Sequence, residues 1–106
     1  MSIDKYFTVK TIQDIEKNFS YVTVVGSFKS LENAQKYAKE LSENNSNISI
    51  LPVTKDGNYR VTAGKSYSFF NLEDAVDERN TIRNSITEKA WTLLTKKTDI
   101  ENAGGL

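Results

Sequence analysis

Two stretches of the chain change from strand-like to helix-like hydrophobic spacing, and the second stretch repeats the first. Residues 21–28 (YVTVVGSF) are rich in β-branched and aromatic side chains, which fit a half-buried strand. The apolar residues that follow, Leu31, Ala34, Ala38 and Leu41, recur as one face of a helix. The same order returns in residues 59–64 (YRVTAG) and 71–75 (NLEDA), the latter matching residues 30–34 (SLENA). The chain therefore contains two strand-helix units.

Two further strands complete the units. Residues 48–53 (ISILPV) follow an Asn-rich turn, and Pro52 lacks a backbone donor, which favours an edge or an end for this strand. Asp56-Gly57 supplies the positive φ of a tight hairpin, so this strand should pair antiparallel with residues 59–64. Residues 90–94 (AWTLL) form the last strand.

The resulting order, βαββαβ, predicts the fold class. Right-handed crossovers place both helices on one face of the sheet. We therefore predict an α+β, ferredoxin-like split βαβ fold: a four-stranded antiparallel sheet with two helices on one face and the other face open. The predicted core consists of Val25, Leu31, Ala34, Ala38, Leu41, Ile50, Tyr59, Val61, Leu72, Ala75, Ile82 and Ile86.

The two ends of the chain depart from this pattern. Residues 5–10 (KYFTVK) fit a short strand, and Thr11 can cap a short helix after it. We predict an N-terminal extension at residues 1–19, either packed on the domain or acting as an arm. The domain itself should span residues 20–96. Residues 97–106 show no periodicity and should form a mobile tail.

Composition excludes several function classes. The 14 Lys and Arg balance the 14 Asp and Glu and are spread evenly, so we expect no nucleic-acid and no membrane partner. The RNA-recognition motif shares the topology, but its aromatic signature phrase is absent. Without His or Cys, the chain lacks the commonest general base, the thiolate nucleophile and the usual zinc ligands. We expect no enzyme activity, no metal and no cofactor.

Several short phrases, in order, resemble the sporulation-related repeat (SPOR) domain over about residues 21–95. They are VGSF at 25–28, ENA at 32–34, YRV at 59–61, EDA at 73–75 and AW at 90–91. No phrase is specific alone, but their order and spacing together are. The resemblance implies a non-enzymatic module that binds peptidoglycan, preferentially glycan strands stripped of stem peptides, along the open face of the sheet.

Four residues are candidates for glycan binding. A stripped glycan strand presents hydroxyl, acetamido and lactyl carboxylate groups, so its site needs a cation, hydrogen-bonding groups and some apolar surface. Arg60 is the candidate carboxylate partner, although an ordinary surface arginine is the alternative. Ser27 matches the Gly-Ser-Phe phrase of the family, and Asn58 falls where some members carry an aromatic residue. Val24 stands where many members carry glutamine. A valine or isoleucine at this position resembles a branch of the family associated with Bacteroidetes. Trp91 fits either the core or the sheet face.

A structural role is the competing function. SPOR domains usually belong to exported or membrane-anchored proteins. This sequence shows no export signal and no run of about 20 apolar residues. We expect synthesis in the cytoplasm, with the cell wall, the periplasm or a virion as alternative sites of action. An assembly component, for example a decoration or connector protein of a bacteriophage, would use the same fold for contacts with other protein chains. Phe7, Tyr67 and Phe70 are the interface candidates, because large aromatic side chains on added segments often anchor interfaces.

Overall fold

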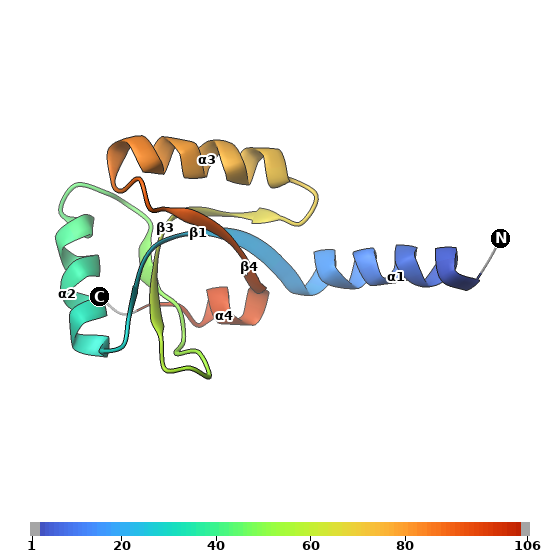
Figure 1. The fold of residues 1–106 in the computed structure, drawn as a ribbon, viewed down its shortest axis with the longest axis horizontal. Helices are drawn as coiled ribbons and strands as arrows, with labels where there is room; N and C mark the ends of the chain where they lie inside the picture. Colours follow the sequence, from blue (N-terminus) through green and yellow to red (C-terminus); the bar gives the residue numbers. More distant parts are fainter. Residues whose placement is uncertain (1–2, 105–106) are drawn as a thin grey trace.

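Four antiparallel strands form one sheet in the order β2-β3-β1-β4 (Figure 1). The computed structural model describes the backbone of residues 3–104 and the side chains of residues 11–104. Its elements are α1 (Ile3–Asn18), β1 (Phe19–Phe28), α2 (Leu31–Ser42), β2 (Ile48–Ile50), β3 (Tyr59–Ser68), α3 (Leu72–Ser85), β4 (Trp91–Lys96) and α4 (Lys97–Glu101). The predicted ferredoxin-like α+β fold is confirmed.

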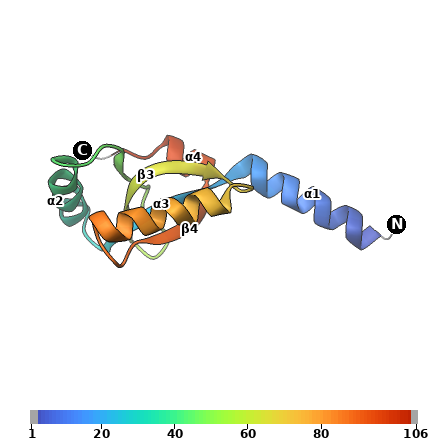
Figure 2. The ribbon, with the colours of Figure 1, turned by 90° about the horizontal axis from the view of Figure 1, so that it is seen from above.

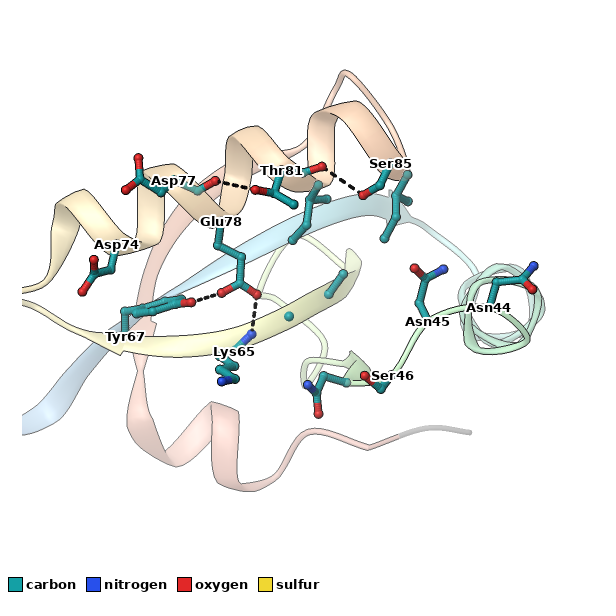
Figure 3. Close-up of a pocket in the computed structure, with 15 residues that line it drawn as sticks. Asn44, Asn45, Ser46, Lys65, Tyr67, Asp74, Asp77, Glu78, Thr81 and Ser85 are labelled. Atoms are coloured by element: carbon teal, nitrogen blue, oxygen red, sulfur yellow. Dashed lines mark hydrogen bonds between the residues drawn. The ribbon is translucent and has the colours of Figure 1, made fainter.

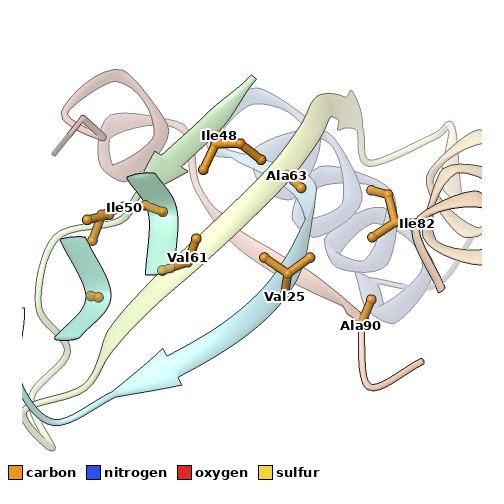
Figure 4. Close-up of a cluster of buried hydrophobic side chains, with 9 residues drawn as sticks. Val25, Ile48, Ile50, Val61, Ala63, Ile82 and Ala90 are labelled. Carbon is orange, nitrogen blue, oxygen red and sulfur yellow. The ribbon is translucent and has the colours of Figure 1, made fainter. Parts of the chain in front are cut away.

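The core lies between the sheet and the two helices α2 and α3 (Figures 1 and 4). Ala34 and Ala38 of α2 are fully buried, and such small side chains allow a helix to approach a sheet closely. Ile82 is the buried side chain through which α3 joins the same cluster. The other members of the cluster come from the strands and from the end of the loop before β4: Val25, Ile48, Ile50, Val61, Ala63 and Ala90.

Most of the predicted core residues are confirmed as buried, but Leu31 and Leu72 are wrong. They are 42% and 47% exposed, respectively. Each is the first residue of its helix, and helical side chains lean toward the N-terminus, so these two point past the end of the sheet. The remaining differences are of degree, since the partly buried side chains packed against the core include Leu41, Tyr59 and Ile86.

The two helix starts also differ from one another. Ser30 caps α2, because its hydroxyl oxygen accepts a hydrogen bond of 3.3 Å from the backbone N-H of Asn33. Asn71 occupies the same position before α3, but its side chain makes no capping hydrogen bond. The repeated sequence phrase therefore starts a helix in both places, but it forms the side-chain capping hydrogen bond only in the first.

The strand predicted at residues 5–10 is wrong. The whole stretch Ile3–Asn18 forms the single helix α1, and Thr11 lies inside it rather than at its start. Figures 1 and 2 show α1 projecting beyond the end of the sheet and running directly into β1. At this junction the Ser68 hydroxyl donates a hydrogen bond of 3.4 Å to the Glu16 carboxylate.

The C-terminal region contains regular structure that the sequence did not predict. After β4 the chain forms the short helix α4, and Gly104 then pairs with Ile50 in an antiparallel bridge. In Figure 1, α4 lies on the side of the sheet away from α3. The face predicted to be open is therefore partly covered. Within residues 3–104, no helix combines the length and the apolar character needed to cross a membrane.

Candidate functional site

Cross-strand pairing collects the predicted site residues on one face of the sheet. Arg60 on β3 pairs with Ser27 on β1. Val24 on β1 pairs with Thr62 on β3 and with Trp91 on β4. Residues directly opposite each other in a ladder point to the same face. The core side is occupied by Val61 and Ala63, so these residues all belong to the face opposite α2 and α3.

A cation-π contact links the two outer strands of this site. The guanidinium carbon of Arg60 lies 5.5 Å from the centroid of the Trp91 ring. Because β1 lies between β3 and β4, the Arg60 side chain must cross β1 to reach this ring. Val24 lies on β1 next to Trp91 and is fully buried. Val24 therefore forms the floor of the site and does not offer a surface contact.

Ser27 and Asn58 flank the arginine. Ser27 is exposed, whereas Asn58 is half-buried in the hairpin that precedes β3. The backbone N-H of Asn58 donates 3.0 Å to the Thr54 hydroxyl, and the ammonium of Lys29 donates 2.9 Å to the backbone carbonyl of Asp56. These bonds hold the hairpin beside the end of β1, and they thereby fix the backbone next to Arg60.

The extra residue in β1 explains why Ser27 lies on the same face as Val24. Between Val24 and Gly26 the register with β3 shifts, and Gly26 rather than Val25 stands opposite Val61. Such a bulge sends two consecutive residues toward one face. Val25 and Gly26 therefore both lie on the core side, and Ser27 returns to the other face, opposite Arg60. A Cβ atom on Gly26 would lie only 3.0 Å from the Tyr37 ring, which accounts for the glycine.

A polar cleft of about 700 Å³ lies on the other side of the molecule, between α3, β3 and the Asn-rich loop 44–47 (Figure 3). Glu78 is its central residue. Its carboxylate accepts a hydrogen bond of 2.8 Å from the backbone N-H of Lys65 and another from the Tyr67 hydroxyl. The hydrogen bond that Tyr67 donates to Glu78, together with burial and nearby negative charge, raises the pKa of Tyr67 to about 12. Among the described residues, no group of three or more acidic side chains is placed to hold a metal ion.

The three interface candidates have different surroundings. Phe70 is 64% exposed and leans on Phe69, with the ring centroids 5.9 Å apart. Phe69 in turn stacks on Tyr21, also at 5.9 Å. Tyr67 is half-buried and bonded within its own domain, as described above. The side chain of Phe7 lies outside the described residues.

Trp91 is the functional residue that sequence reasoning left undecided. Its exposed fraction is 39%, and its partner Val24 assigns it to the sheet face. The alternation of residues 90–94 is too short to show on which face of the sheet Trp91 lies. The pairing of this strand with β1 determines the face. The contact of Trp91 with Arg60 depends in addition on β1 lying between β3 and β4.

Comparison with protein-family models matches residues 17–90 to the SPOR domain. The matched segment begins in the last turn of α1, includes β1, α2, β2, β3 and α3, and ends one residue before β4. Neither the curated proteins nor the solved structures include a significant match.

Proposed function

Because the chain belongs to the SPOR domain family, whose members are peptidoglycan-binding modules, we propose that it binds glycan strands stripped of their stem peptides. The contact surface consists of Ser27, Arg60 and Trp91, with Val24 beneath them, and is called the Arg60 surface below. The chain would act there as a binding module without catalysis.

The observation that carries this proposal is the placement of the Arg60 guanidinium over the Trp91 ring. A guanidinium held by its face keeps its N-H groups available at its edge, where they can bind a carboxylate in bidentate fashion. Among residues 11–104, Arg60 has no ion-pair partner that would compete for these donors. The lactyl carboxylate of a denuded strand fits this requirement.

The neighbours of Arg60 match the rest of the ligand. The exposed Trp91 ring offers an apolar face for the C-H side of a sugar, and the Ser27 hydroxyl can exchange hydrogen bonds with sugar hydroxyls or acetamido groups. A stem peptide on the lactyl group would remove its negative charge by forming an amide. The surface should therefore prefer denuded strands over intact peptidoglycan.

Replacing Arg60 by alanine should weaken binding to amidase-treated sacculi by about 10- to 100-fold, the range of a charge-assisted hydrogen bond. Co-sedimentation with sacculi, before and after amidase treatment, measures the effect. The melting temperature should stay nearly unchanged, because a solvent-accessible charge contributes little to folding. Arg60→Lys should recover only part of the affinity, since an ammonium cannot form the bidentate contact.

Arg79→Ala is the matched control. Arg79 lies on α3, on the opposite side of the sheet, and its guanidinium donates hydrogen bonds to the side chain of the neighbouring Asn80. This variant removes the same charge without changing the Arg60 surface, so its sedimentation should equal that of the wild type. Equal losses for both variants, or no sedimentation of the wild type, would contradict the proposal.

A second candidate function, assembly through protein contacts, is favoured by the exposed ring of Phe70 in the loop between β3 and α3. Figure 1 shows this loop at the end of the sheet from which α1 projects. Tyr21, Phe69 and Phe70 form a continuous row of rings there. Light scattering at increasing concentration should then show self-association that Phe70→Ser abolishes. Leu31→Ser, at an exposed leucine of α2, should leave it unchanged. A wild type that stays monomeric at millimolar concentration would argue against self-assembly.

A further inference from the structure

The C-terminal segment 97–104 lies on the same face of the sheet as the Arg60 surface. Ile100 of α4 and Ala103 line a cavity of about 220 Å³ together with Val22, Leu51 and Thr62. Thr62 lies two residues after Arg60 on β3, and Val22 lies two residues before Val24 on β1. The segment therefore lies over the direct continuation of the Arg60 surface.

Burial along this face follows the segment. Val22 and Thr62 are each 7% exposed and Leu51 is 5% exposed, although they face away from α2 and α3. The part of the face beyond Val24 is open, because Ser27 and Trp91 are exposed there. One half of the sheet face is thus covered by the end of the chain, and the other half is free.

The cover is held weakly. α4 has only five residues, none of which is buried. Two backbone hydrogen bonds fasten its end to the edge strand: the N-H of Ile50 donates 2.8 Å to the carbonyl of Gly104, and the N-H of Gly104 donates 3.1 Å to the carbonyl of Ile50. Below α4 remain the 220 Å³ cavity and a second of about 270 Å³ lined by Ser20, Ser66 and Ile100, among others. Both are open to solvent, so α4 covers this part of the sheet incompletely.

We infer that residues 97–104 form a strap that determines which length of glycan strand the sheet face accepts. This inference rests on the function proposed above. A short muramic-acid disaccharide binds the Arg60 surface with the strap in place. A long denuded strand extends past Val24 onto Val22 and Thr62. It can bind there only after the strap has moved away from these two residues.

An engineered disulfide can lock the strap. Because Ile50 pairs with Gly104 in an antiparallel bridge, Leu51 and Ala103 are the next opposing pair, and both line the same cavity. Ile50 and Gly104 exchange both hydrogen bonds. In a regular antiparallel ladder the pair next to such a pair has Cα atoms about 4.5 Å apart, which is within reach of a disulfide. The chain has no cysteine of its own, so Leu51→Cys/Ala103→Cys would form the single bridge, and its reduced form is the matched control.

The oxidised variant should bind long denuded strands at least about tenfold more weakly than the reduced variant, with equal affinity for the disaccharide. In the wild type, long strands should also accelerate hydrogen exchange at the Ile50 amide, whereas the disaccharide should not. The strap hypothesis is refuted if the oxidised and reduced forms bind long strands equally. It is also refuted if the Ile50 amide stays protected from exchange when long strands are bound.

The Arg60→Ala substitution, made in the reduced variant, separates the two hypotheses. If it removes binding of both ligands while oxidation has no effect, the proposed function stands and the strap is refuted. If the reduced variant and the wild type bind neither ligand, the proposed function fails and the strap fails with it.

Discussion

Replacing Gly64 with alanine should lower the free energy of unfolding by about 2 to 4 kcal/mol. Gly64 has φ of +83°, a left-handed conformation that costs a non-glycine residue energy. An added Cβ would also lie 1.7 Å from a carboxylate oxygen of Glu78. The carboxylate can turn away, but it then loses its hydrogen bonds to the Lys65 amide and the Tyr67 hydroxyl.

Gly57→Ala separates these two costs. Gly57 has nearly the same φ, +79°, but no atom lies within 4 Å of its added Cβ, so this change should cost only about 1 kcal/mol. Urea unfolding of both variants measures the difference. In a Glu78→Ala background, the loss in the free energy of unfolding caused by Gly64→Ala should fall to that caused by Gly57→Ala. Equal effects of the two glycine substitutions in the wild-type background would refute the role assigned to Glu78.

Replacing Ile82 with alanine should cost about 2 to 5 kcal/mol, the range for removing a buried aliphatic side chain and leaving a cavity. Ile82 is 6% exposed and is the member of the core cluster that α3 contributes. A small domain has only about 5 to 15 kcal/mol of stability, so this variant should be close to unfolding at 37 °C.

The control lies on the same helix. Leu72 is 47% exposed, so Leu72→Ala should change the free energy of unfolding by less than about 1 kcal/mol, although the sequence assigns both side chains to the core. Thermal unfolding followed by circular dichroism compares the two variants. Similar losses for both would mean that the Leu72 side chain packs against the domain, contrary to its exposure in the structure.

The fold can be predicted from sequence because its determinants are local. The valine-rich run before Gly26, the helical spacing from Leu31 to Leu41 and the Asp56-Gly57 turn each specify one element, and the crossover rule assembles them. The face on which Arg60 lies could be predicted for the same reason, since the alternation of β3 assigns it to the polar face.

The partners of Arg60 could not be predicted in this way. Its contact with Trp91 depends on β1 lying between β3 and β4, and its pairing with Ser27 depends on a bulge that places Val25 and Gly26 on one face. Both are properties of pairing between distant strands. The error at α1 has a local cause, because six residues of alternating character fit a strand and a helix equally well.

The position of β1 in the sheet also has consequences for how the chain folds. Val22 on β1 pairs with Leu93 on β4, so the central strand can pair with one of its two neighbours only after α2, β2, β3 and α3 have been synthesised. Pairing over such a sequence distance closes late and slows folding. Until β4 is synthesised, the Val-rich edge of β1 remains unpaired and can pair with strands of other chains.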